Sequence, residues 1–517
     1  MIDRSFALVA YLSKVLSLYR AFYNPFAGAR SWLLGPCVLL VLTGGLCPGI
    51  SARADGLTVR LSLVSLSPAV VKIEGETLRA RDIWSFRNTY GRVIGLGERI
   101  DNFRATDSAG LSVAVLRLGI VDFKSERPVS HFSYQVCVTE PANSLDEAHV
   151  SWLNEQFGYL MLADLLPSIA PEQQHSAAVQ IEFRLPPNWE IASSAQANRE
   201  GRFAVPDPDT AVFFIGNDLR VRHKQIGGTE FLFAAVGAWP FPGDYVTAIA
   251  ARIIKDHARH TGFEIPDRAV LMLAPYRGKE GAERWTAETR GSNVVLLLGP
   301  NSPPDVLLGR LSVILTHELF HLWVPGALSF IGDYDWFFEG FTLYQALCSA
   351  VRLGLIDFQE YLSTMARVYD SYLATSDRDR LSLVDASRQR WTIGSSLVYD
   401  KGMLVGFLCD LSLRILSRNR RSLDNLYREL FRQQRAGGPR VDGNEVLINL
   451  LNRELGMEQF TRHYLSTPGA VRLETELSVF GLMVESSDNH SRLKVIQGLS
   501  NEERRLLESL GYRKPRQ

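Results

Sequence analysis

The stretch "THELFHLW", residues 316–323, places two imidazoles and a carboxylate inside an otherwise apolar run. Prolines are tolerated in the first turn of a helix, so "SPPD" at residues 302–305 is typical of a helix start. Pro325 and Gly326 indicate where the helix stops. We therefore expect one helix between these signals, with the polar side chains in its last turns. Burying them requires either a metal or hydrogen-bond partners in an ordinary core.

His317 and His321 are four residues apart, so on a helix they lie about 40° apart around the axis and about 6 Å apart along it. Both imidazoles can therefore face one ion. Glu318 projects beside the pair, where its carboxylate can reach a water bound to that ion without binding the ion itself. This is the H-E-x-x-H pattern, in which two histidines bind zinc and the glutamate is a general base.

A third candidate ligand is Glu339, the acidic residue in the run "WFFEGFTLY" at residues 336–344. Asp333 or Asp335 is expected to cap a second helix that continues to about Arg352. A buried carboxylate without a partner is costly, and a metal removes that cost. The alternative is a carboxylate that only complements the helix dipole. Two histidines, one glutamate and a water make a catalytic zinc site with an open position, so we predict one zinc ion here.

Tyr399 is a candidate hydrogen-bond donor in "SLVYDKGMLVGFLCDL", residues 396–411. Hydrolysis of an amide builds negative charge on the carbonyl oxygen, and a phenol opposite a metal can stabilise that charge. Spacing alone does not distinguish Tyr399 from the other tyrosines of the chain.

The three segments "HELFHLW", "WFFEGFTLY" and "YDKGMLVGFLCDL" resemble the glycyl aminopeptidase family of zinc metallopeptidases, which is related to the alanyl-type aminopeptidases in the gluzincin clan. The similarity extends over residues 244–484. It implies a thermolysin-like catalytic domain. The site it implies has zinc on His317, His321 and Glu339, with Glu318 as the base and Tyr399 as the donor to the oxyanion.

The same resemblance implies a glutamate that captures the free amine of a peptide substrate. The corresponding segment, residues 281–299, reads "GAERWTAETRGSNVVLLLG". We place the substrate-binding role on Glu288, just before the strand expected at residues 293–299, because "ETRGS" is closest to the family's pattern. Glu283 is the alternative. The Gly-Gly-Leu-Glu-His form found in the relatives is not intact here, so amine recognition has the weakest motif support.

An apolar, uncharged run at residues 32–50 follows Arg30 and precedes "ARA" at residues 52–54. This order predicts a signal peptide that is cleaved after residue 54, and export to the periplasm or the exterior. The alternative is an uncleaved segment that anchors the protein in a membrane.

The composition bears on the partners of the protein. Basic and acidic residues are balanced at 56 each, which gives no reason to expect nucleic acid as a partner. After residue 54 three cysteines remain, Cys137, Cys348 and Cys409. Such a sparse, odd set is no disulfide framework and predicts buried thiols. The partner that the candidate site implies is a peptide or protein substrate.

The expected fold class is α+β, with an N-terminal antiparallel β domain before a thermolysin-like, mainly helical zinc peptidase domain. Alternating runs such as "TVRLSLVSL" at residues 58–66 fill the β-rich region, residues 55–243. An amphipathic helix at residues 244–262 opens the catalytic domain, residues 244–484. A tail with one short helix follows at residues 485–517, too short for the PDZ-type domain that the family often adds.

We therefore predict an exported zinc metallopeptidase, an aminopeptidase that hydrolyses peptide bonds by zinc-activated water. Two alternatives stay open. If Glu288 does not bind an amine, the same site would make an endopeptidase. A catalytically silent binding protein with the peptidase fold would bind zinc and cleave nothing.

Overall fold

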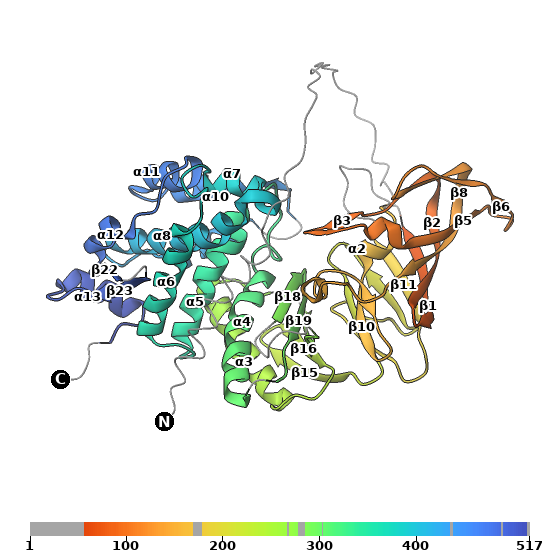
Figure 1. Cartoon of the computed structure of the whole chain (residues 1–517), viewed down its shortest axis with the longest axis horizontal. Coiled ribbons are helices and arrows are strands. Elements are labelled where there is room, and N and C mark those ends of the chain that lie inside the picture. The colour runs from red at the N-terminus through yellow and green to blue at the C-terminus, as the bar shows by residue number, and fades with distance from the viewer. Residues whose placement is uncertain are drawn as a thin grey trace, which may run out of the picture.

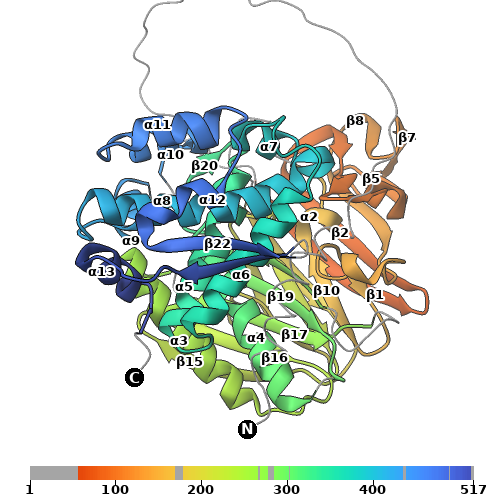
Figure 2. The same cartoon turned by 60° about the vertical axis from the view of Figure 1, so that its left-hand side comes forward.

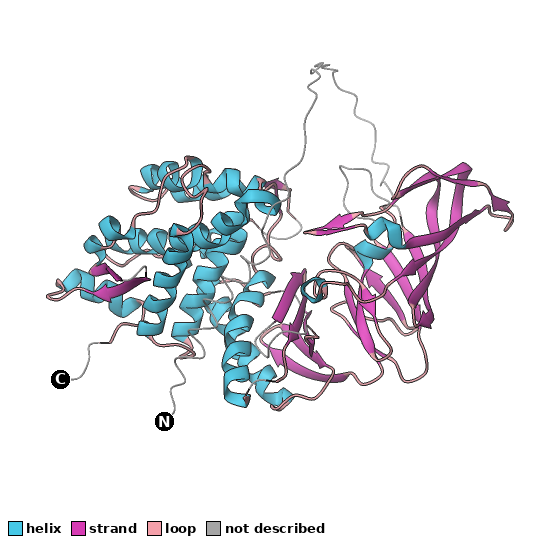
Figure 3. Cartoon of the chain, in the orientation of Figure 1, coloured by secondary structure: helices cyan, strands magenta, loops and turns pink. Residues whose placement is uncertain are grey.

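The computed structural model describes residues 56–168, 178–265, 268–277, 285–301, 303–434, 438–487 and 490–513. The candidate signal segment, residues 1–54, lies outside these ranges. Strands dominate the first half of the described chain and helices the second half (Figure 3), which confirms the predicted α+β class. Within the described ranges, no helix combines the length and the apolar character needed to cross a membrane.

An eight-stranded sheet forms one end of the molecule (Figure 1). Its order is β13-β11-β1-β2-β8-β5-β6, and β7 pairs with β8. β1 and β11 run parallel, which differs from the purely antiparallel arrangement expected. The bounds are β1 Leu57–Leu66, β2 Ala69–Ser85, β5 Ile100–Thr106, β6 Ser112–Val113, β7 Val115–Arg117, β8 Asp122–Cys137, β11 Val179–Arg184 and β13 Arg202–Val205.

A four-stranded sheet with the order β12-β14-β10-β9 packs between two other layers. Leu160, Phe213 and Ile215 face the core that is shared with the eight-stranded sheet. Tyr159 and Phe214, one position along, face a second core on the other side. Burial on both faces explains why β14 is apolar at every position. The bounds are β9 Trp152–Leu153, β10 Phe157–Met161, β12 Glu190–Ala192 and β14 Val212–Gly216.

The third layer is a five-stranded sheet with the order β15-β16-β17-β19-β18. Its strands are β15 Arg220–Ile226, β16 Thr229–Ala235, β17 Arg268–Pro275, β18 Trp285–Arg290 and β19 Asn293–Leu298. β15 and β16 precede residue 243, where the domain division is predicted, yet they pair with the strands that follow it. The sequence analysis did not predict β18, which is an edge strand. Glu288 lies within β18, rather than in a loop before the strand expected at residues 293–299.

Helices cover the five-stranded sheet and then form the other end of the molecule. α3 and α4 lie along the sheet, and the later helices gather beyond them (Figure 2). The bounds are α2 Leu162–Leu165, α3 Gly243–Thr261, α4 Pro304–Glu318, α5 Thr342–Arg352, α6 Phe358–Leu373, α7 Leu383–Arg388, α8 Gly402–Leu416, α9 Leu423–Gln433, α10 Gly443–Asn452, α11 Met457–Thr461, α12 Leu473–Glu476 and α13 Asn501–Ser509.

Three two-stranded sheets complete the described strands. β3 Thr89–Tyr90 and β4 Val93–Ile94 form a hairpin, and β20 Phe330–Ile331 pairs with β21 Val441–Asp442. β22 Leu482–Ser487 and β23 His490–Val495 pair within the segment expected as a tail. This segment is packed on the helices, because Asp370 of α6 accepts a hydrogen bond from the Ser491 amide and two leucines of α13 are buried.

Candidate active site

α4 and the turn after it position the two histidines of the H-E-x-x-H pattern. α4 ends at Glu318, earlier than expected, and the chain tightens into a 3-10 turn over Phe320–Leu322. His317 therefore lies at the end of α4 and His321 within the turn. Both imidazoles are buried, and Nδ1 of His321 lies 2.9 Å from the Val324 carbonyl oxygen. A carbonyl only accepts, so this contact places the proton on Nδ1 and leaves the Nε2 lone pair free to face the site.

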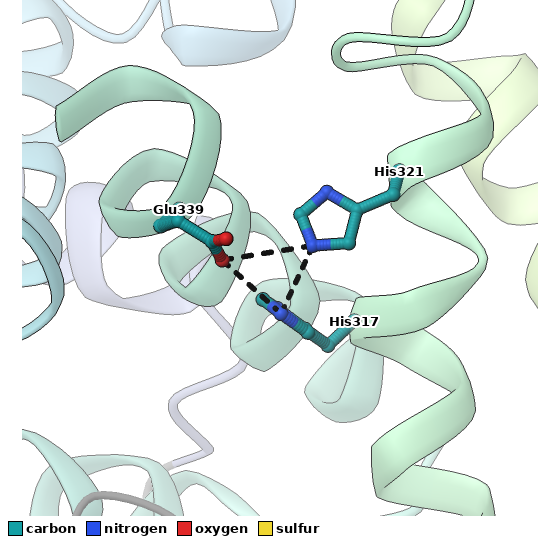
Figure 4. A group of neighbouring side chains, drawn as sticks. All are labelled: His317, His321 and Glu339. Atoms are coloured by element: carbon teal, nitrogen blue, oxygen red, sulfur yellow. Dashed lines mark hydrogen bonds and ion pairs between the residues drawn. The ribbon is translucent and has the colours of Figure 1, made fainter. Parts of the chain in front are cut away.

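The imidazoles and the Glu339 carboxylate converge on one point (Figure 4). The two Nε2 atoms of His317 and His321 are 3.1 Å apart, and Glu339 Oε2 lies 3.6 Å from each of them. All three ligand atoms lie within 4.8 Å of one another. The sequence expectation that these side chains face one another is met by this geometry.

This donor set fits a divalent cation of the zinc type. Glu339 Oε2 is buried and has no hydrogen-bond partner among the described residues. Two imidazole nitrogens and one carboxylate oxygen match the ligand types of catalytic zinc sites. Burial, together with the neighbouring His321 and Arg390, holds the pKa of His317 well below its usual value, so the ring is neutral as a metal ligand must be.

Glu339 is delivered by a π-helical turn, Trp336–Phe341, that leads into α5. Asp335 precedes this turn, but no side-chain hydrogen bond caps it. The predicted helix-capping role of Asp335 is therefore wrong, because its carboxylate pairs with Arg390 instead. Arg390 also donates from Nη2 to Glu339 Oε1 at 2.7 Å.

The glycine pair Gly340 and Gly402 brings Tyr399 close to Glu339. A Cβ on Gly340 would lie 2.5 Å from the Cα of Gly402 and 2.7 Å from the Val398 carbonyl oxygen. Only glycine allows so close an approach of the two backbones. The π-helical turn Leu397–Lys401 is thus held against the turn Trp336–Phe341, and the buried Tyr399 hydroxyl accepts a hydrogen bond of 2.7 Å from Arg390 Nη2.

Glu318 lies beside the cluster and is 3% exposed. Its Oε2 accepts a hydrogen bond of 3.0 Å from the Thr289 hydroxyl of β18. Burial raises the pKa of Glu318 to about 8, against the effect of this hydrogen bond, and the nearby charges of Glu339 and Glu288 act in the same direction as burial. A carboxyl with such a pKa can accept and release a proton near neutral pH.

Glu288 lies on β18 with its carboxylate turned toward the N-terminal strands. Its Oε1 accepts a short hydrogen bond from the Tyr90 hydroxyl, and its Oε2 lies 2.7 Å from Nδ1 of His149. Burial alone would raise the pKa of Glu288, but the contact with His149 and the charge of Arg290 hold it at about 2. The side chain is therefore ionised at neutral pH. The alternative residue, Glu283, lies outside the described ranges.

A cavity of about 440 Å³ joins all the described site residues. It is bounded by segments far apart in the sequence, from the β3–β4 hairpin to the π-helical turn Leu397–Lys401. Its lining includes Tyr90, Arg92, Val93, His149, Trp285, Glu288, Thr289, Arg290, His317, Glu318, His321, Phe338, Glu339, Arg390, Trp391 and Tyr399. The cavity thus brings together the cluster of two histidines and one glutamate, the Glu318 carboxyl and the ionised Glu288 carboxylate.

The lining residues that the sequence did not indicate include Tyr90, His149, Thr289 and Arg390. Tyr90 and His149 belong to the β-rich region, where no spacing gathers titratable groups. Arg390 follows the exposed Arg388 by two residues, and nothing in the local pattern separates a buried arginine from a solvated one. Thr289 could have been found only with β18 assigned as a strand beside α4.

The fold and the site together define a metallopeptidase, a hydrolase, with a buried cluster of two histidines and one glutamate beside the Glu318 carboxylate. A family model also matches part of the chain: residues 331–405 match the model of the M61 glycyl aminopeptidase family. The resemblance seen in the sequence motifs is thereby confirmed. No curated protein sequence matches the chain.

Solved structures share the fold. An aminopeptidase N family protein from Idiomarina loihiensis superposes with a TM-score of 0.73 at 18% identity, over 83% of this chain and 79% of that chain. An M1 zinc metallopeptidase from Deinococcus radiodurans gives a TM-score of 0.52 at 15% identity, over 81% of this chain and 95% of that chain. A mutant of the latter bound to a Tyr-Ser-Ala substrate gives 0.53 at 14% identity, with the same two coverages. At these identities the likeness concerns the fold.

Proposed function

We propose that the protein is an exported, zinc-dependent aminopeptidase with one zinc ion in each chain. The observation that carries the proposal is the convergence of two imidazole nitrogens and a carboxylate oxygen within 4.8 Å, in a cavity that also contains Glu318. The unpartnered, buried Oε2 of Glu339 supports the presence of a cation, since a carboxylate oxygen without a partner is costly to bury.

His317, His321 and Glu339 would hold the zinc ion. When bound, zinc lowers the pKa of a water and polarises a substrate carbonyl. Glu318 accepts a proton from the attacking water and passes it to the nitrogen of the leaving amine. Tyr399 donates a hydrogen bond to the carbonyl oxygen while negative charge builds up there. Thr289 orients the Glu318 carboxylate through the hydroxyl bond of 3.0 Å.

Glu288 supplies the preference for a free amine in this scheme. Its carboxylate is ionised, lines the cavity and lies one residue from Thr289, so it can face the ammonium group of a peptide bound across the site. The contacts to Tyr90 and His149 fix its position. They also engage both of its oxygens, and this observation favours the second candidate, an endopeptidase with the same chemistry.

The test compares the wild-type protein with Glu318→Gln. Elemental analysis is expected to find one zinc in each chain of both proteins, and peptide hydrolysis is expected to fall at least about a hundredfold in the variant. The matched control is Glu502→Gln, because Glu502 is exposed on α13, away from the cavity lining. Full activity in Glu318→Gln would refute the scheme.

The same assay separates the remaining alternatives. An aminopeptidase cleaves peptides with a free N-terminus and leaves their acetylated forms intact, whereas an endopeptidase cleaves both. A silent binding protein would contain zinc and cleave no peptide in a diverse library. Export is tested separately, by mass spectrometry of the mature N-terminus, which we expect at residue 55; a retained segment at residues 32–50 would indicate the membrane-anchored alternative.

A further inference from the structure

The Arg390 guanidinium lies between the candidate metal ligand and the candidate oxyanion donor. Its Nη2 donates to Glu339 Oε1 and to the Tyr399 hydroxyl oxygen, each at 2.7 Å, and its Nη1 donates to Asp335. The side chain is 12% exposed. Burying a guanidinium is costly unless its charge is compensated, and Asp335 and Glu339 compensate it here.

Arg390 determines which oxygen of Glu339 faces the two imidazoles. With Oε1 engaged by the guanidinium, Oε2 points to the histidines at 3.6 Å from each. Without this contact the carboxylate could rotate about its terminal torsion, which is broad for glutamate. A donor that holds the other carboxylate oxygen removes this freedom and so favours metal binding, because the carboxylate is already ordered before the ion binds.

Arg390 also determines the direction of the Tyr399 hydroxyl proton. Arginine has donors only, so the phenol oxygen must be the acceptor in this pair. The phenol proton is therefore directed away from the guanidinium. Tyr399 lines the cavity, where a phenol that accepts from the guanidinium can donate its proton to a substrate oxygen.

Three aromatic rings lie around the guanidinium. Its central carbon lies 4.6 Å from the Trp391 ring centroid and 5.6 Å from those of Phe338 and Tyr399. A planar, forked cation suits such a site, whereas the ammonium of lysine is a compact point charge. The arrangement therefore requires arginine rather than positive charge alone.

We propose that Arg390 is a positioning residue of the site, which holds Glu339 for one-oxygen metal binding and turns the Tyr399 hydroxyl toward the substrate. This inference rests on the proposed peptidase function. It adds one claim of its own: the two contacts made by one nitrogen atom link zinc affinity to the rate of the chemical step.

The experiment uses Arg390→Gln and Arg390→Lys, with Arg388→Gln as the matched control because Arg388 is 61% exposed and pairs only on the surface with Asp385. Zinc affinity is measured by competition with a chromogenic chelator, and kcat and KM are measured separately. We expect Arg390→Gln to lower zinc affinity about tenfold to a hundredfold. We expect kcat of the fully zinc-loaded variant to fall about tenfold to a hundredfold with KM little changed.

A double-mutant cycle with Tyr399→Phe distinguishes positioning from a general structural role. Tyr399→Phe alone is expected to lower kcat about a hundredfold, and in the Arg390→Gln background the further loss should be less than about tenfold. Additive losses would overturn the proposal. If Arg390→Gln fails to fold, Arg390→Lys tests the proposal instead, because lysine keeps the positive charge but lacks the forked donors of the guanidinium. Wild-type zinc affinity and wild-type kcat in Arg390→Lys would overturn the proposal.

The outcomes also separate this inference from the proposed function. A wild-type protein that cleaves no peptide contradicts the proposed function, while the chelator competition still tests the effect of Arg390 on Glu339. An active wild-type enzyme whose Arg390 variants match Arg388→Gln in zinc affinity and kcat contradicts the role of Arg390 alone.

Discussion

Three buried histidines of the described chain show that burial by itself does not make a metal ligand. His317 and His321 direct their Nε2 atoms at each other and at a carboxylate. His257 is equally buried, but its Nε2 lies 3.0 Å from the Thr316 carbonyl oxygen, and its ring packs edge-on against Phe320. Its role is to join α3 to α4, as a core residue with an ordinary hydrogen bond.

The pH dependence of stability should report on His257. Burial lowers its pKa to about 3, and the charges of Arg352 and His260 act in the same direction, while Asp256 and the bond to Thr316 oppose them. A folded pKa below the unfolded value of about 6.5 means that the neutral ring stabilises the fold fully above pH 6.5. This stability is lost progressively as the pH falls toward 3.

We expect this contribution to the free energy of unfolding to fall by roughly 3 kcal/mol between pH 7 and pH 4. His257→Phe should not show this fall. Urea denaturation of both proteins at several pH values measures it. Chelator-treated protein is used throughout, so that acid release of metal does not contribute. Parallel pH profiles for the wild type and the variant would contradict this role of the ring.

At the scale of the element, β18 serves two parts of the molecule with its two faces. Side chains alternate along a strand, so Thr289 points to α4 while Glu288 and Arg290 point to the N-terminal strands. Arg290 donates to the His149 carbonyl oxygen at 2.6 Å, and its guanidinium lies 3.7 Å from the Tyr90 ring centroid. One short edge strand thereby contacts both the proposed base, Glu318, and the candidate amine-binding carboxylate of Glu288.

Thr289→Val should separate the first of these roles from the second. The substitution keeps the β-branched shape and removes the hydroxyl bond to Glu318, so the carboxylate loses an orienting partner. We expect kcat to fall about fivefold, since such a bond contributes roughly 1 kcal/mol, with the zinc content unchanged. Steady-state kinetics and elemental analysis measure both effects.

The control for this prediction is Thr58→Val, because Thr58 is exposed on β1 in the eight-stranded sheet. An unchanged kcat in Thr289→Val would show that the bond does not orient the base. Loss of zinc would show instead that the substitution disturbs the metal cluster through the end of α4.

At the scale of the whole molecule, three sheets and a helical region are joined by shared cores. The four-stranded sheet has one face in the core of the eight-stranded sheet and the other in the core of the five-stranded sheet. The cavity lies where the β3–β4 hairpin and His149 meet β18, the end of α4 and the π-helical turns that carry Glu339 and Tyr399. Its shape therefore depends on the docking of the β-rich region against the peptidase region.

Phe214→Ala tests this dependence. Phe214 is fully buried in the core between the four- and five-stranded sheets, and it stacks on Tyr159 at 4.6 Å between ring centroids. Truncation should destabilise the protein by about 3–5 kcal/mol, through lost burial and the cavity that remains. Because the layers share cores, we expect one cooperative unfolding transition, shifted as a whole.

The measurement is urea denaturation followed by circular dichroism and by tryptophan fluorescence. Coincident transitions from the two probes support a single cooperative unit. A helical signal that unfolds at the wild-type urea concentration, after an earlier loss of the strands, would contradict it.

Local patterns predicted much of the site. The spacing of His317 and His321 fixes their shared face on a helix, and Glu339 is conspicuous as an acidic residue in an aromatic run. The α+β class followed from alternation in the first half of the chain and helical periodicity in the second. These features depend on residues within one or two turns of each other, so one sequence is enough to read them.

Tertiary structure alone decided what surrounds these residues. Tyr90 lies 198 residues from Glu288, and His149 lies 139 residues from it, so no local period links them. β18 is stabilised by pairing with β19 and by contacts across the cavity, and the tight approach of Gly340 to Gly402 sets where Tyr399 lies. Arg390 is only 12% exposed, and two acidic partners and a phenol accept its hydrogen bonds. The sequence by itself determined the metal ligands proposed here and the class of fold, because both rest on short-range patterns. The contacts of Glu288 with Tyr90 and His149, and those of the Arg390 guanidinium, required the folded chain, because they join segments that are distant in the sequence.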